Sequence, residues 1–76
     1  MNKARKQDLM NVVSSLEEAI DRLGEIRDEE QEAFENLPEG FQNESRGDAM
    51  LDAVDMMDGW SEEISNIVCE IEEYVK

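Results

Sequence analysis

The feature that most constrains the fold is an apolar repeat with alternating spacings of three and four residues, which occurs twice in the chain. The first copy comprises Leu9, Val12, Leu16, Ala19, Leu23, Ile26, Glu30, Ala33 and Leu37, and the second comprises Met50, Ala53, Met57, Trp60, Ile64, Ile67, Ile71 and Tyr74. A neighbouring row widens each copy to a stripe of about three-sevenths of the helix surface. Its members are Val13, Ile20, Arg27 and Phe34, followed by Val54, Ser61, Val68 and Val75. Stripes of this width are typical of bundle helices, so we expect an all-α chain of two helices that pack on each other.

The segment between the two copies predicts a turn. Pro38 disfavours helix at the residue before it, and Gly40 is expected to adopt a left-handed turn conformation. Ser45, with Asp48 three residues later, resembles a capping box at the start of a second helix. We therefore expect a single domain over 1–76, with a helix over 3–36, a loop over 37–45 and a helix over 46–75. A loop of this length favours an antiparallel αα-hairpin.

A two-helix hairpin leaves part of each stripe uncovered, because each helix covers only one side of the other. The side chains expected at an oligomer interface are Ile20, Phe34, Val54, Trp60 and Val68. Their burial is worth several kcal/mol at about 25 cal/mol per Å². We expect a homodimer that forms a four-helix bundle, and the alternative is that this surface binds a different protein.

The charge of the chain excludes whole classes of partner. There are 21 Asp and Glu against 7 Lys and Arg, a net charge of −14, and residues 17–63 hold 17 of the acids with only three arginines. Such a chain repels nucleic acid and anionic membranes, so the expected partner is a basic protein surface. Carboxylates at this density can also take the places of phosphates on a surface that normally holds DNA. The expected binding residues are Asp28, Glu29, Glu32, Glu35, Asp48, Asp52, Asp55, Asp58 and Glu62, with Phe41 in the loop as an apolar anchor. The alternative is an acidic surface that only interacts with solvent.

The residue inventory argues against catalysis. Without His and with Cys69 as the only cysteine, the chain lacks a zinc site, an internal disulfide and a His-based catalytic pair. Paired carboxylates such as Asp52 and Asp55 are expected on an exposed ridge, where burial does not tune their acidity. We therefore expect no enzyme activity, cofactor or metal. No apolar run suits a signal peptide or a membrane span, so the expected location is the cytoplasm of a host cell.

The turn region carries a resemblance. The stretch 27–42, which includes Leu37-Pro38-Glu39-Gly40-Phe41-Gln42, and the stretch 45–50, which begins Ser45-Arg46-Gly47, resemble short acidic helical-hairpin proteins of bacteriophages and mobile elements. The resemblance covers about a third of the chain and implies a hairpin fold and a phage source. Small acidic phage proteins are often inhibitors of host nucleic-acid enzymes, anti-CRISPR proteins included. The leading hypothesis is therefore a phage inhibitor that acts by DNA mimicry, and the alternative is a structural or assembly protein that acts through its helix bundle.

Overall fold

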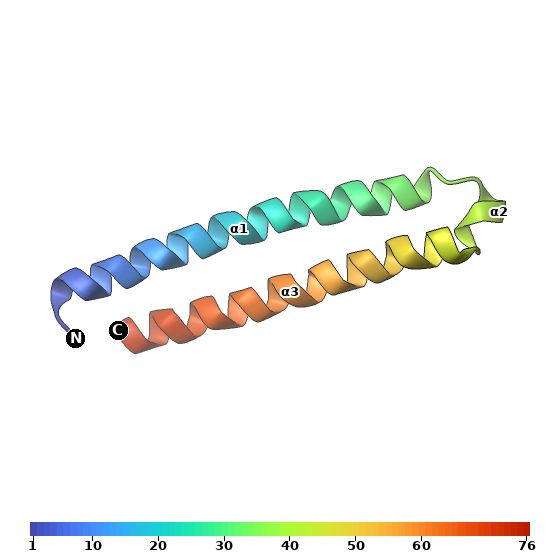
Figure 1. Cartoon of the computed structure of the whole chain (residues 1–76). Helices are drawn as coiled ribbons and strands as arrows, with labels where there is room; N and C mark the ends of the chain where they lie inside the picture. Colours follow the sequence, from blue (N-terminus) through green and yellow to red (C-terminus); the bar gives the residue numbers. More distant parts are fainter.

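The computed structural model describes residues 1–76 as a long, narrow hairpin of antiparallel helices (Figure 1). Helix α1 spans Lys3–Glu35, the short α2 spans Glu39–Gln42, and α3 spans Ser45–Val75. The hairpin measures 59 × 15 × 12 Å, and its two termini lie at the same end. The prediction of an all-helical chain is confirmed, and both long helices begin and end within one residue of their expected bounds.

Helix α1 begins where a side chain can satisfy its first amides. Asn2 has an extended backbone, and its Oδ1 accepts a hydrogen bond of 2.8 Å from the backbone N–H of Arg5. This is the usual role of asparagine at an N-cap. At the other end, Asn36 donates its backbone N–H to the carbonyl of Glu32 at 3.0 Å, and Pro38 prevents further helix.

The turn differs from its sequence prediction in two ways. Gly40 lies inside α2, and no residue of the chain has a positive φ, so the predicted left-handed turn at Gly40 is wrong. The chain instead changes direction through the extended residues Pro38 and Glu44. The predicted capping box is also wrong, because Ser45 is the first residue of α3 and its N-cap Glu44 makes no side-chain cap hydrogen bond.

Two residues that the sequence prediction overlooked hold this turn together. Gln42 donates from Nε2 to the carbonyl oxygen of Leu37 at 2.9 Å and, more weakly, to that of Phe34 at 3.5 Å, which satisfies carbonyls at the end of α1. Gly47 is buried against the backbone of Gln42, where a Cβ would lie 2.8 Å from the carbonyl carbon. Only glycine fits this close approach of α2 to α3.

Each long helix carries three apolar rows at heptad spacing, and the structure covers two of them. In α1 the covered rows are Leu9, Leu16, Leu23 and Glu30, and Val13, Ile20, Arg27 and Phe34; in α3 they are Met50, Met57, Ile64 and Ile71, and Val54, Ser61, Val68 and Val75. Every one of these residues is buried or half-buried. The third row, which contains Val12 in α1 and Trp60 in α3, is mostly exposed.

This placement corrects the expectation about which residues face inward. Val13 is 1% exposed and Val12 is 46% exposed, whereas the repeat was expected to bury Val12 and leave Val13 at the edge. The physical reason is that three adjacent apolar rows allow two rotations of the helix, each of which buries two rows. The spacing of the residues is the same in both cases.

Candidate functional site

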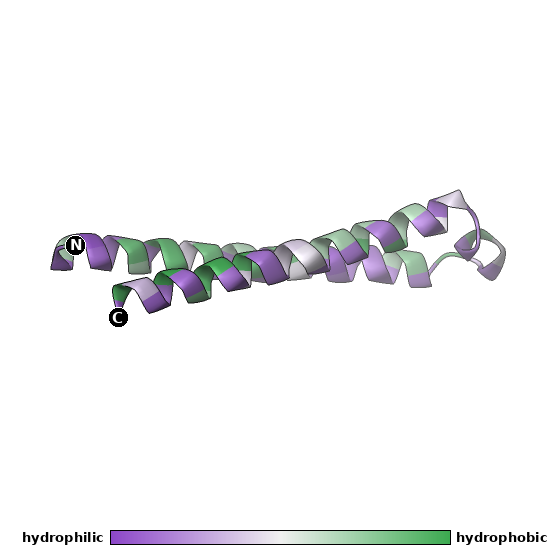
Figure 2. Ribbon diagram, turned by 90° about the horizontal axis from the view of Figure 1, so that it is seen from below, coloured by the Kyte–Doolittle hydropathy of each residue, from purple (hydrophilic) through white to green (hydrophobic).

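The uncovered apolar rows of the two helices lie on one face of the hairpin. Because α1 and α3 run antiparallel, an approximate two-fold axis normal to the plane of the hairpin relates them, so equivalent rows share a face. We define the apolar face as Val12, Ala19, Ile26 and Ala33 of α1 with Ala53, Trp60, Ile67 and Tyr74 of α3. Its large side chains are between 39% and 74% exposed. Figure 2, seen from below, shows hydrophobic and hydrophilic segments alternating along both helices.

The opposite side of the hairpin is polar. We define the polar face by the residues one position after the covered rows of Leu9 in α1 and Met50 in α3. They are Met10, Glu17, Gly24 and Gln31 of α1 with Leu51, Asp58, Ser65 and Glu72 of α3. At 100° per residue, the next row outward on the same side is acidic in both helices. These acidic rows are Asp21, Asp28 and Glu35 of α1 with Asp48, Asp55 and Glu62 of α3, and all six side chains are exposed.

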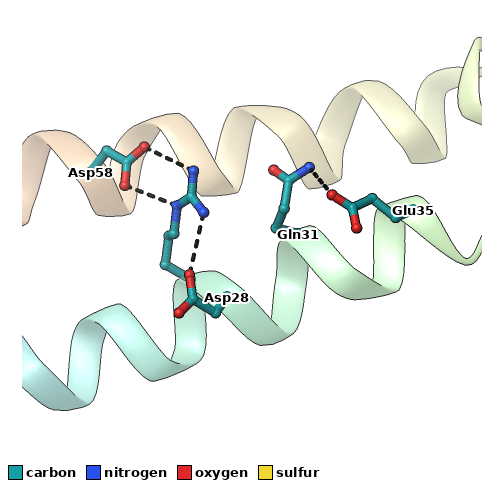
Figure 3. A network of polar contacts seen from close by, with 5 residues as sticks. Asp28, Gln31, Glu35 and Asp58 are labelled. Carbon is teal, nitrogen blue, oxygen red and sulfur yellow. Dashed lines mark hydrogen bonds and ion pairs between the residues drawn. The ribbon is translucent and has the colours of Figure 1, made fainter.

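An ion pair links the two helices across the polar face (Figure 3). Arg27 donates from Nε to Asp58 Oδ1 at 3.0 Å and from Nη2 to Asp58 Oδ2 at 3.5 Å, and from Nη1 to Asp28 Oδ1 at 3.3 Å. The hydrogen bonds to Asp58, and secondarily the one to Asp28, raise the pKa of the Arg27 guanidinium above its ordinary value. We call the Arg27–Asp58 contact the cross-helix ion pair.

The cross-helix ion pair explains why an arginine interrupts an apolar row. The stem of Arg27 lies in the row of Val13, Ile20 and Phe34, while its charged head reaches the polar face, so its side chain is only 33% exposed. The ion-pair partners of Arg27 are Asp58 in α3 and Asp28 in α1. The contact also sets residue 27 level with residue 58 in the register of the hairpin.

The structure places all ten expected binding residues on the surface. Asp28, Glu35, Asp48, Asp55 and Glu62 belong to the acidic rows, and Asp58 belongs to the polar face. Glu32 and Asp52 lie on the side of their helices that points away from the other helix. Glu29 lies on the side of the apolar face. Phe41 lies in α2 at the end of the hairpin and is 51% exposed. The acids therefore gather mainly on the side of the polar face, with Phe41 apart from them.

Most of the negative charge has no positive partner within the chain. Only four of the 21 acidic residues form ion pairs: Glu25, Asp28, Asp58 and Glu73. Asp28 and Asp58 are thus the only expected binding residues that already form an ion pair, and Glu35 accepts a hydrogen bond of 3.1 Å from Gln31 Nε2 (Figure 3). Asp55 and Glu62 of the acidic rows are exposed and form no ion pair or side-chain hydrogen bond, so they can interact with a cationic surface without breaking a contact of the hairpin.

The residues expected at an oligomer interface are not all available on the surface. Val54 and Val68 are buried between α1 and α3, and Ile20 and Phe34 are half-buried there, because they belong to the covered rows. Trp60 alone among the five is exposed, at 46%. Ile67 and Tyr74 belong to the same row as Trp60 but are not among the expected interface residues, and both are exposed.

Other features of the surface are minor. The single thiol, Cys69, is exposed, and with Glu70, Glu73 and Tyr74 it lines a shallow depression near the C-terminus. No three of the His, Cys, Asp and Glu side chains come close enough to hold a metal ion. Neither long helix contains a stretch that is apolar and long enough to cross a membrane.

Comparisons with family models, with curated proteins and with solved structures found no match to this chain. The resemblance of the turn region to phage hairpin proteins therefore stays a prediction. What the chain does is inferred from its residues and their arrangement.

Proposed function

We propose that this chain is a non-catalytic acidic interaction protein, which acts as a homodimeric four-helix bundle and binds a basic surface of another protein. The proposed target is a host enzyme that acts on nucleic acid, and the proposed role is that of a phage-encoded inhibitor whose carboxylates take the places of phosphates. The observation that carries the proposal is the uncompensated charge: 17 of the 21 acidic side chains form no ion pair with another residue of the chain.

The arrangement of these acids fits a polyanion mimic. A net charge of −14 over a hairpin 59 Å long is about one negative charge per 4 Å, and two hairpins side by side reach about one per 2 Å. Duplex DNA carries about one charge per 1.7 Å of its axis. The acids are held on rigid helices, so little conformational entropy is lost when they meet a basic groove.

A pair of matched variants tests the proposal. Asp52, Asp55 and Glu62 are exposed and unpaired, and their joint replacement by lysine changes the net charge from −14 to −8. Asp58 is left intact because its loss would break the cross-helix ion pair. The control replaces Asp8, Glu70 and Glu72 by lysine, which makes the same change of charge near the termini.

The assay captures proteins from host lysate at about 50 mM and about 500 mM salt, where screening differs strongly. Each captured protein is then purified, and its affinity for duplex DNA is measured with and without the chain. We expect capture at low salt only, and competition with DNA by the native chain and the control. The Asp52, Asp55 and Glu62 variant should compete at least tenfold less well. Equal capture at both salt concentrations, or equal competition by the two variants, contradicts the proposal.

The exposed apolar face favours one alternative, a structural or assembly protein whose task is the helix interface itself. Under this alternative, Trp60→Ala abolishes function by dissolving the oligomer, whereas charge reversal on the acidic rows is tolerated. Under the inhibitor proposal, charge reversal abolishes target binding while the oligomer persists. Measuring oligomer mass and target binding on the same samples separates the two functions.

A further inference from the structure

The hairpin exposes far more surface than a chain of its size requires. Its accessible surface is 5698 Å², whereas a compact monomer of 8.7 kDa exposes about 4,700 Å². Its radius of gyration is 17.3 Å against about 11 Å for a compact domain of this length, and only 5 of its 76 residues are buried. The excess of about 1,000 Å² is close to the roughly 800 Å² that each partner buries in a standard interface.

The apolar face is where this excess can be covered. Its rows run from Val12 to Ala33 and from Ala53 to Tyr74, three heptads in each helix, or about 32 Å. Met56, on the row beside it in α3, is 47% exposed and widens it. A second copy presents a strip of the same length and the same heptad spacing, so the face is complementary to itself in period and extent.

The charge distribution selects one orientation for that second copy. The third of the hairpin nearest the loop, residues 28–52, holds nine acidic residues and one arginine, a charge of −8. The third nearest the termini is neutral, because residues 1–16 carry +2 and residues 64–76 carry −2. If the loops of the two copies pointed in the same direction, the acidic third of one copy, with its charge of −8, would lie beside the acidic third of the other. Loops at opposite ends place each acidic third beside a neutral one that carries Lys3, Arg5 and Lys6.

Side-chain size selects the same orientation independently. With the register set by the cross-helix ion pair, Val12 lies level with Tyr74 near the termini, and Ala33 lies level with Ala53 near the loop. When the loops are at opposite ends, the large Val12 and Tyr74 side chains of each copy meet the small Ala33 and Ala53 side chains of the other. The large side chains then fill the space that the alanines leave. When the loops point the same way, Ala33 and Ala53 of one copy face those of the other and leave a gap, while the Val12 and Tyr74 side chains of the two copies crowd one another.

We propose that the apolar face is the docking surface for a second copy of this chain, packed with the two loops at opposite ends. The resulting four-helix bundle buries the apolar face and leaves the polar face and acidic rows of both copies on its two outer sides. This deepens the homodimer in the proposed function and rests on that part of it alone. Loss of the dimer with salt-sensitive target binding retained would contradict only this inference.

Two variants test the surface. Ile67 on the apolar face and Leu51 on the polar face have similar exposure, at 47% and 37%, so Ile67→Glu and Leu51→Glu form a matched pair. We expect sedimentation equilibrium to give about twice the chain mass of 8.7 kDa for the native chain and for Leu51→Glu. Ile67→Glu should have the mass of one chain. A native chain of single mass with full helicity by circular dichroism overturns the proposal, as does an equal effect of the two variants.

If the hairpin needs its partner to fold, Ile67→Glu is unfolded as well as monomeric. The melting temperature of the native chain, measured at several protein concentrations, resolves this case. A melting temperature that rises with concentration shows that dimerisation stabilises the fold. A melting temperature independent of concentration, together with an unfolded Ile67→Glu, overturns the proposal.

Cysteine cross-linking tests the orientation. In a Cys69→Ser background, chains with Ala33→Cys are mixed with chains with Val12→Cys and equilibrated with oxidised and reduced glutathione. The two-fold axis that relates copies with loops at opposite ends packs α1 of one copy on α1 of the other, which brings position 33 of one copy to position 12 of the other, so the mixed disulfide should predominate. Each variant alone should remain uncross-linked. Copies whose loops point the same way pack α1 on α3 instead, so predominant disulfides in a mixture of Ala33→Cys and Ala53→Cys chains would overturn this orientation.

Discussion

The three glycines within the long helices should respond differently to the same substitution. Ala is better than Gly by up to about 1 kcal/mol in a helix interior, so local propensity alone predicts that Gly24→Ala, Gly47→Ala and Gly59→Ala all stabilise. A Cβ at Gly24 or Gly59 meets no atom within 4 Å. A Cβ at Gly47 would lie 2.8 Å from the carbonyl carbon of Gln42 and 3.0 Å from its Cα.

These distances set the expected magnitudes. Gly24→Ala and Gly59→Ala should each raise the free energy of unfolding by about 0.5–1 kcal/mol. Gly47→Ala forces α2 away from α3, because backbone cannot move aside as a flexible side chain does. Overpacking of this kind costs about 1–3 kcal/mol. Displacement of Gln42 adds about 1 kcal/mol if its hydrogen bond to Leu37 is lost. The overlap therefore outweighs the gain in propensity.

Thermal unfolding followed by circular dichroism measures the effect. A change of 1 kcal/mol moves the melting temperature of a domain this small by about 4–8 °C. We expect Gly24→Ala and Gly59→Ala to melt higher than the native chain, and Gly47→Ala to melt at least about 4 °C lower. All samples are compared at one protein concentration, because dimerisation shifts the transition. A Gly47→Ala chain as stable as Gly59→Ala would refute the close approach of α2 to α3.

Three further outcomes are expected from the contacts of the hairpin. Gln42→Ala should lower the free energy of unfolding by about 1 kcal/mol in urea titrations, because a carbonyl of Leu37 loses its donor; an unchanged midpoint would contradict this. Arg27→Met keeps a long stem but breaks the cross-helix ion pair, so its melting temperature should fall below that of the native chain. Because the pKa of Arg27 is raised, the guanidinium stays charged well into alkaline solution, and its stabilising effect is lost at high pH only as pH rises through that pKa. The deficit of Arg27→Met should therefore be constant between about pH 6 and 9, where an unpaired arginine is also charged. Finally, raising salt from about 10 to 200 mM should raise the melting temperature of the native chain, because screening weakens the repulsion among 14 excess negative charges; a fall would contradict this reasoning.

The helices themselves were predictable because their signals are local. The alternating spacing and the position of Pro38 placed both long helices within one residue of Lys3–Glu35 and Ser45–Val75. The exposure of the candidate acids was also predictable, because they all lie off the apolar stripe. The turn was not predictable in detail, since Gln42 and Gly47 act through contacts between α1, α2 and α3. The one sequence signal for the close approach of α2 to α3 was Gly47, a glycine in the expected first turn of a helix. Its φ is not positive, so the close approach and not a left-handed backbone is what requires it.

The sequence by itself determined that the chain makes two amphipathic helices joined by a short turn, and that its negative charge is concentrated in residues 17–63. Only the tertiary structure decided which two of three apolar rows face inward. Residue spacing is unchanged when a helix turns about its own axis by the width of one row, so periodicity alone leaves the choice open. The packing of Val13 against α3 and the reach of Arg27 to Asp58 make that choice. They turn Trp60, Ile67 and Tyr74 outward and direct most of the candidate acids to the other side.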